Sequence, residues 1–122
     1  MTVYLLDTNI VSADAPAKRQ VGQDAFAAWV RDHGDRLYIS TVTIAEIEAG
    51  IARAIRIGAT TKAERLRKWL DAVEHFYAGR ILAFGIEDAR HAGAILDQAR
   101  SHDPGFEDIA IAATAAAHGL TV

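Results

Sequence analysis

The sequence contains no cysteine, so disulfide bonds and thiolate metal ligands are both excluded. No apolar run approaches the roughly 20 residues needed to cross a bilayer, and the N-terminus lacks the basic start and long apolar stretch of a signal peptide. There is no glycine-rich phosphate loop, and no serine stands in the context of a hydrolase nucleophile. We therefore expect a cytoplasmic protein without membrane attachment.

The composition is that of one globular domain with an uneven charge distribution. The chain has 122 residues, of which 51% are hydrophobic and 24% charged, so residues 1–122 suffice for a single domain with a real core. The net charge is −3, yet residues 53–80 hold seven basic and three acidic side chains. Such a segment can steer a polyanion toward the molecule, although a solvated helix face with mixed charges has the same composition.

Short apolar runs alternate with helical patterns along the chain. The expected strands span residues 3–6, 37–39, 81–84 and 120–122, and the expected helices span residues 20–33, 41–57, 61–77, 87–101 and 107–118. This alternation predicts parallel βα units and hence an α/β fold, a three-layer α/β/α sandwich around a central parallel sheet. The chain ends within the last expected strand, which predicts that this strand and the C-terminal end of the domain are truncated.

Asp7 follows the first expected strand, at the place where ligands bind in open α/β sheets. It is followed by Thr8 and Asn9, whose side chains can hydrogen-bond around a carboxylate. The alternative is structural, because Asp7 would also cap a short helix running through Ile10 and Val11. Position alone leaves both interpretations open.

Glu46 lies within the expected helix 41–57. At 100° per residue, four isoleucines form one apolar stripe on this helix: Ile44, Ile47, Ile51 and Ile55. Glu46 points away from the stripe, and its own face carries small residues and one base: Ala49, Gly50 and Arg53. Such a face leaves room for a phosphate backbone. Two alternatives remain, since the spacing from Thr43 to Glu46 fits a helix capping box and periodicity does not prefer Glu46 over Glu48 as a ligand.

Asp108 opens the expected helix 107–118, where the helix dipole favours a negative charge. Glu107 beside it serves that purpose equally well, so helix electrostatics also explain the acid pair. The rest of this helix is almost wholly apolar and rich in alanine, which predicts burial against the sheet. Gly119 suits a left-handed helix end, and Asp103-Pro104 fits either a helix start or a loop turn.

The three acids share a structural context, because each follows a strand or lies early in the next helix. In a parallel sheet these positions gather at one edge, so we expect Asp7, Glu46 and Asp108 to meet there. Clustered carboxylates repel one another, and a divalent cation relieves that repulsion. Oxygen ligands without histidine or cysteine favour Mg²⁺ or Mn²⁺ over zinc, and such sites hold phosphates and activate water for in-line attack.

Three blocks of the sequence resemble the VapC and FitB branch of the PIN-domain proteins, the ribonuclease toxins of type II toxin–antitoxin modules. The blocks are Leu5-Leu6-Asp7-Thr8-Asn9, then Ile39 to Ile47 followed by Gly50, and then Phe106 to Ala113 leading to Ala117-His118-Gly119-Leu120. Their order and spacing cover nearly the whole chain, and all three blocks together are more specific than any one of them.

The resemblance implies an endoribonuclease that uses Mg²⁺ or Mn²⁺ to hydrolyse RNA. The family's acids correspond to Asp7, Glu46 and Asp108 rather than to Glu48 or Glu107, and its supporting polar positions to Thr8, Asn9 and Thr43. We expect Arg53 and Arg56 to contact RNA phosphates. The resemblance also implies a homodimer and a VapB-type antitoxin whose C-terminal segment covers the active site, with operator DNA bound only through that antitoxin.

One departure from the family concerns a fourth acid, which members supply from an Asp-Phe beyond the last strand, whereas this sequence stops at Val122. The alternative function is therefore a catalytically weak or inactive module that acts through complexes with antitoxin and operator DNA. Two other Mg²⁺-binding α/β classes are disfavoured. A receiver domain needs an acid pair after the first strand and a late lysine, and a haloacid-dehalogenase-type phosphatase needs an aspartate where Asn9 stands.

Overall fold

The computed structural model describes residues 2–12 and 23–122, with the side chains of residues 23–27 outside the description. Its parallel sheet has the order β1-β2-β3 and is formed by β1 (Tyr4–Leu5), β2 (Leu37–Ser40) and β3 (Ile81–Leu82). Tyr4 of β1 pairs with Leu37 of β2. Thr121 forms an isolated parallel bridge with Tyr4, and it lies within the residues predicted to form a fourth strand.

Helices fill most of the remaining described chain. They are α1 (Thr8–Ser12), α2 (Gln23–His33), the 3₁₀ turn η2 (Gly34–Arg36), α3 (Thr41–Arg56), α4 (Thr60–Phe76), α5 (Ile86–Gln98) and α6 (Phe106–His118). The predicted helix 20–33 begins in residues outside the description and is observed from Gln23 onward. Within residues 2–12 and 23–122, no helix combines the length and apolarity that a bilayer span requires.

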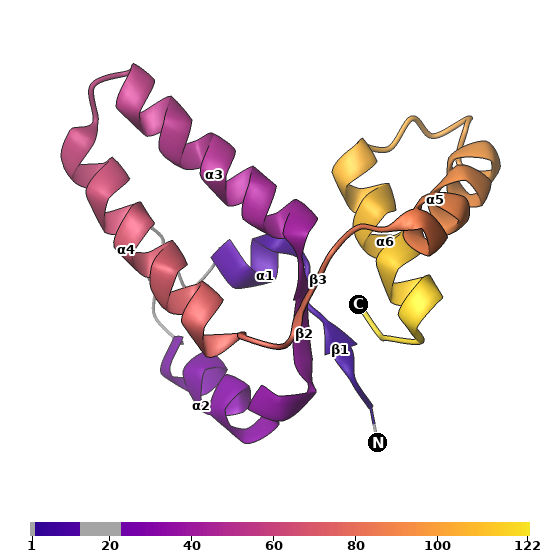
Figure 1. The fold of residues 1–122 in the computed structure, drawn as a ribbon, viewed down its shortest axis with the longest axis horizontal. Coiled ribbons are helices and arrows are strands. Elements are labelled where there is room, and N and C mark those ends of the chain that lie inside the picture. Colours follow the sequence, from indigo (N-terminus) through magenta and orange to yellow (C-terminus); the bar gives the residue numbers. More distant parts are fainter. Residues whose placement is uncertain (1, 13–22) are drawn as a thin grey trace.

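The sheet separates two apolar layers, as predicted for a three-layer sandwich. Figure 1 shows α1 to α4 on one side of the sheet and α5 and α6 on the other. Successive strand residues point to opposite faces, so Leu6 packs in the core beneath α3 and α4 while Leu5 packs with Ile111 and Ala115 of α6. The central strand β2 is buried at Leu37, Ile39 and Ser40 because helices cover both of its faces.

The predicted apolar stripe of α3 is only partly buried. Ile47 and Ile51 lie in the core, and Ile44 is partly buried against it. Ile55, however, is 59% exposed, so the stripe is not buried along its whole length. The α3–α4 hairpin extends well beyond the sheet, and among the described elements the last turns of α3 lie beside α4 (Figure 1).

The ends of two helices decide between alternatives that the sequence left open. Ser40 caps α3, with its hydroxyl accepting the N–H of Val42 at 3.0 Å, so the alternative of a capping box from Thr43 to Glu46 is wrong. At the start of α6 the cap is Gly105, and Asp103 takes a φ of 45°, so Asp103-Pro104 is a loop turn rather than a helix start. Gly119 ends α6 with a φ of 68°, as predicted.

Candidate functional site

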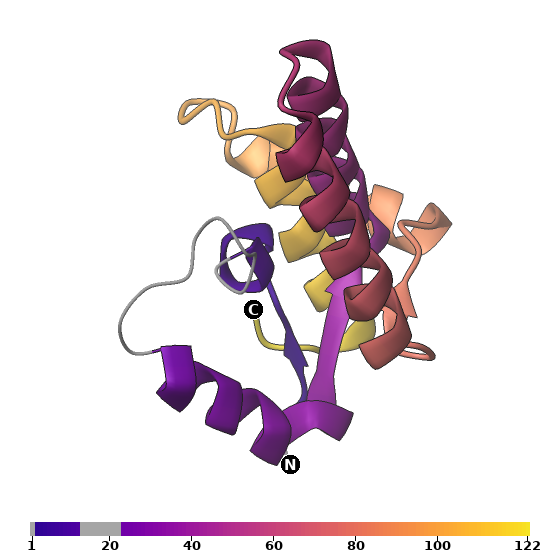
Figure 2. The same cartoon turned by 90° about the vertical axis from the view of Figure 1, so that its left-hand side faces the viewer.

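The carboxyl edge of the sheet brings three segments of the chain together. β1 runs directly into α1, β2 runs directly into α3, and α6 begins at the same end of the molecule (Figures 1 and 2). The packing agrees with this arrangement, since α3 contacts both α1 and α6. The segments that carry the predicted acids therefore meet at one edge of the sheet, as the parallel topology requires.

Asp7 connects β1 to α1 and is partly buried. Its Oδ1 accepts the backbone N–H of Ile10 at 2.8 Å, which confirms the helix-cap interpretation. A carboxylate has about four acceptor positions, and this hydrogen bond uses one. Capping α1 and binding a cation are therefore compatible roles for Asp7. Asn9 follows on α1 and is exposed.

Glu46 of α3 is tied to α1 through Thr8. The Thr8 hydroxyl donates to Glu46 Oε1 at 2.6 Å, and its oxygen lies 3.1 Å from the Thr43 hydroxyl. A hydroxyl has one proton, so the Thr43 hydroxyl donates to Thr8 in turn. Thr43 is fully buried, so its hydroxyl has a fixed position. It orients the Thr8 hydroxyl, which in turn donates to the Glu46 carboxylate.

Glu48 has a different environment from Glu46, although both lie on α3. Arg67 of α4 donates two hydrogen bonds to the Glu48 carboxylate, through Nη1 at 2.9 Å and through Nη2. These hydrogen bonds, with a smaller contribution from the Arg67 charge, lower the pKa of Glu48 below its ordinary value despite partial desolvation. Glu48 therefore helps to join α3 to α4, while Glu46 is the acid that faces α1.

Asp108 lies in the first turn of α6 and is exposed, as is Glu107. The two differ in direction, because the Glu107 carboxylate lies back against the helix cap, with Oε2 3.0 Å from where a Cβ on Gly105 would stand. Asp108 has no hydrogen-bond or ion-pair partner among the described residues. It thus presents an uncompensated carboxylate at the N-terminus of α6.

The structure unites some of the predicted site residues more closely than others. Thr8, Thr43 and Glu46 are hydrogen-bonded together, and Asp7 adjoins Thr8 in sequence. In residues 2–12 and 23–122, no three acid or histidine side chains are grouped so as to hold one metal ion as they stand. The convergence of Asp7, Glu46 and Asp108 on a single cation therefore stays a prediction. The donors themselves, all carboxylate and hydroxyl oxygens, suit a hard cation.

The basic segment divides into free and engaged side chains. Arg53 and Arg56 are exposed along α3, beyond Glu46. Arg67 is occupied by Glu48, and Arg80 donates to the backbone carbonyls of Gly34, Leu37 and Phe76. Two of the seven bases are thus committed to structure, and the charge available to a polyanion is smaller than composition indicates.

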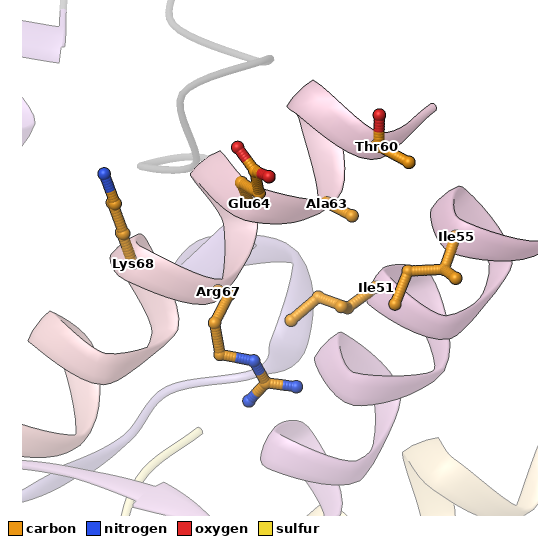
Figure 3. Close-up of a pocket in the computed structure, with 7 residues that line it drawn as sticks. All are labelled: Ile51, Ile55, Thr60, Ala63, Glu64, Arg67 and Lys68. Carbon is orange, nitrogen blue, oxygen red and sulfur yellow. The ribbon is translucent and has the colours of Figure 1, made fainter. Parts of the chain in front are cut away.

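A pocket of about 430 Å³ lies between α3 and α4 (Figure 3). Its lining residues are Ile51, Ile55, Thr60, Ala63, Glu64, Arg67 and Lys68. Ile51 of α3 reaches toward α4, and Arg67 reaches from α4 toward α3, while Glu64 and Lys68 point away from the space between the helices (Figure 3). An apolar interior cannot replace the hydration of a phosphate, so this pocket is not a site for the RNA backbone.

The two tryptophans are structural. Trp29 and Trp69 both pack against the core beneath α3 and α4. A further aromatic feature, the pair formed by Phe84 and Phe106, was not predicted from the sequence. Phenylalanine in a short apolar run is indistinguishable from a core residue until its exposure is known.

The chain is similar to known proteins along nearly its whole length. The model of the PIN domain family matches residues 4–122. The chain is 33% identical to the plasmid stability protein StbB of Pseudomonas syringae pv. tomato, over 98% of this chain and 85% of the relative. It is 34% identical to the VapC ribonuclease Y4jK of Sinorhizobium fredii, over 98% of this chain and 84% of the relative.

Solved structures give the same result. The structure of FitAcB from Neisseria gonorrhoeae superposes with a TM-score of 0.77 at 32% identity, covering 97% of this chain and 84% of that one. The structure of FitAB bound to the IR36 DNA fragment superposes with a TM-score of 0.74 at 29% identity, covering 97% of this chain and 81% of that one. The fold and the order of its elements are thus shared along almost the whole chain.

Proposed function

This chain belongs to the PIN-domain family, and from that membership we propose that it is the toxin of a type II toxin–antitoxin module, an endoribonuclease dependent on Mg²⁺ or Mn²⁺. The observation that carries the proposal is the meeting of α1 and α3 at the carboxyl edge of the sheet. There Glu46, bound to Thr8, stands beside the strand end that supplies Asp7. This is where open α/β sheets bind ligands, and where we expect two of the acids from the family resemblance.

Asp7, Glu46 and Asp108 are the residues proposed to hold the cation. When bound, it would polarise the scissile phosphate and lower the pKa of the attacking water. Glu46 would orient that water, with its own carboxylate fixed by the hydroxyls of Thr8 and Thr43. Asp108 is exposed and unpaired among the described residues, so its carboxylate is available at the start of α6. The products would carry 5′-phosphate and 3′-hydroxyl ends.

Removing divalent cations should abolish RNA cleavage. The proposed carboxylates cannot by themselves neutralise a phosphate, since they carry the same sign of charge. The purified protein is incubated with transfer, ribosomal or messenger RNA in EDTA, then with excess Mg²⁺ or Mn²⁺, and the 5′ ends of products are identified. Cleavage that continues at full rate in EDTA would contradict the proposal, and recovery with Mn²⁺ but not Ca²⁺ would support it.

Arg53 and Arg56 are proposed to hold the RNA backbone beside Glu46. Gly50 lies on the same face, exposed, and a Cβ built on it meets nothing within 4 Å. The fold therefore does not require glycine there, although glycine weakens a helix. An open, cation-flanked helix face is suited to a polyanion that approaches closely.

Gly50→Ala should separate stability from function. Alanine in an exposed helix interior should raise the free energy of unfolding by about 1 kcal/mol. The added methyl group would stand where the RNA backbone is proposed to pass, so cleavage should fall although the protein is more stable. Urea unfolding and a cleavage assay on the same preparation measure both. Ala49→Gly, on the neighbouring exposed position, is the matched control and should lose stability by a similar amount without blocking RNA.

The proposed partners follow from the same relationship. We propose a VapB-type antitoxin, operator DNA bound only through that antitoxin, and a homodimer of the toxin chain. The FitAB structure bound to a DNA fragment supports the first two, because its chain shares this fold at 29% identity.

A second candidate function is a module that binds antitoxin and DNA without cutting RNA. It is favoured by one observation, the lack of a ready three-acid metal cluster within the described residues. Calorimetry with Mn²⁺ separates the two candidates. Binding that depends on Asp7 together with cleavage supports the nuclease, whereas absence of both supports the non-cutting module.

A further inference from the structure

The edge of the site near Asp108 carries an aromatic pair that catalysis by carboxylates does not use. Phe106 is the first residue of α6, two residues before Asp108, and its side chain is 54% exposed. Phe84 follows β3 and packs edge-on against it, with ring centroids 6.0 Å apart and planes at 65°. Phe106 is therefore an exposed aromatic side chain close in sequence to an acid of the proposed metal site.

Phe84 is held firmly in place. It packs against the core formed by Ala92, Ile109 and Ala113 between α5 and α6. Its backbone N–H donates to Thr41 Oγ1 at 3.2 Å, which joins the end of β3 to the first residue of α3. Phe106 is thus an exposed ring supported from beneath by a ring that is itself anchored in the core.

This arrangement has the properties of a stacking platform. A ring that is already oriented loses little conformational freedom when a flat ligand covers it. Nucleobases are flat and stack on aromatic side chains irrespective of sequence. Resting on the proposed ribonuclease function, we propose that Phe106 stacks against a base of the RNA substrate and is a binding residue of this site.

Helix geometry limits which nucleotide the proposed base can belong to. Residues two apart on a helix point about 200° from one another, so Phe106 and Asp108 face nearly opposite sides of the first turn of α6. The base on Phe106 therefore does not belong to the phosphate held at Asp108, but to a nucleotide further along the strand. Because Phe106 lies next to Phe84, which follows β3, we place that nucleotide toward the β3 edge of the sheet.

The proposal is tested by RNA binding in an Asp7→Asn background, which prevents turnover during the measurement. The probe is a fluorescein-labelled single-stranded RNA of mixed sequence, titrated in Mg²⁺. Phe106→Ala and Phe106→Leu should each raise the Kd about 10-fold, because the stacking contact with the base is lost. Phe106→Trp should bind at least as tightly as the parent. Leucine keeps the apolar contact and the fold, so its effect reports the aromatic ring.

Ile86→Ala is the matched control, since Ile86 is a 69% exposed apolar side chain at the start of α5 and has no ring. It should leave the Kd unchanged. A scan with abasic sites in the RNA gives a second readout. One position should weaken binding about 10-fold in the parent but not in Phe106→Leu, as expected when both changes remove the same contact.

The outcomes distinguish this inference from the function it rests on. If the native chain neither binds nor cleaves RNA, the proposed function itself is wrong. If the native chain cleaves RNA while Phe106→Leu binds and cleaves as the parent does, only the stacking role is overturned. An effect of Phe106→Leu confined to association with a protein partner or a second copy of the chain would also overturn it.

Discussion

Replacing Asp7 with asparagine should lower the rate of RNA cleavage at least about 100-fold while leaving the fold intact. Loss of a residue that merely supports a metal ligand typically costs 10–100-fold, so loss of a ligand charge should exceed that. Asparagine is as good a helix cap as aspartate, and its side-chain oxygen can still accept the Ile10 N–H. The free energy of unfolding should therefore change by less than about 0.5 kcal/mol. Single-turnover cleavage and urea unfolding measure the two quantities separately.

The chain offers matched controls for this experiment. Glu46→Gln and Asp108→Asn should also abolish cleavage, whereas their neighbours on the same helices, changed as Glu48→Gln and Glu107→Gln, should leave it nearly unchanged. Each pair alters one charge at almost the same place in the sequence. A native rate in Asp7→Asn, or equal losses within each pair, would show that the catalytic site lies elsewhere.

The sequence predicts the fold well because the fold depends on periodicity. Apolar runs bounded by polar residues locate β1 and β2, and the 3.6-residue repeat locates α3 within a residue of its observed bounds. Strand β3 is shorter than predicted and ends at Leu82. Phe84, which follows this strand, packs against the core between α5 and α6 instead of continuing the sheet. This tertiary contact cannot be predicted from a short apolar run.

The site is less predictable because it depends on contacts between distant segments. Glu46 and Glu48 are equivalent by helical periodicity, and only the position of Arg67 on α4 and of Thr8 on α1 distinguishes them. The family resemblance selects Glu46, and it does so without reference to these contacts. Ile55 follows the same rule, since its exposure results from the length of the α3–α4 hairpin and not from its place in the repeat.

Arg80 shows how composition can mislead. It counts as a base of the 53–80 segment, but its contacts are structural. Its guanidinium donates to the carbonyl of Leu37 at 2.7 Å and of Phe76 at 2.6 Å, and also to the carbonyl of Gly34. Its Cζ lies 5.4 Å and 5.1 Å from the ring centroids of Phe76 and Tyr77. It therefore joins the end of α4, η2 and β2 at one point.

Arg80→Met should lower the free energy of unfolding by about 3 kcal/mol, because backbone carbonyls would lose a charged donor while the aliphatic stem is kept. This corresponds to a fall in Tm of about 10 °C for a domain of this size. Arg80→Lys should recover only part of the loss, since one ammonium group cannot reproduce the planar fork of donors. Thermal unfolding followed by circular dichroism measures both variants.

Arg90→Met provides the comparison, because among the described residues Arg90 pairs with Glu87 alone, in an exposed ion pair on α5, and its loss should cost less than about 1 kcal/mol. Equal stabilities of the Arg80 and Arg90 variants would contradict the anchoring role. Below its Tm, the folded Arg80→Met protein should still bind RNA with the parent's salt dependence, since a guanidinium already bound to carbonyls neutralises no phosphate. A shallower salt dependence in Arg80→Met would instead show that Arg80 contacts RNA phosphates.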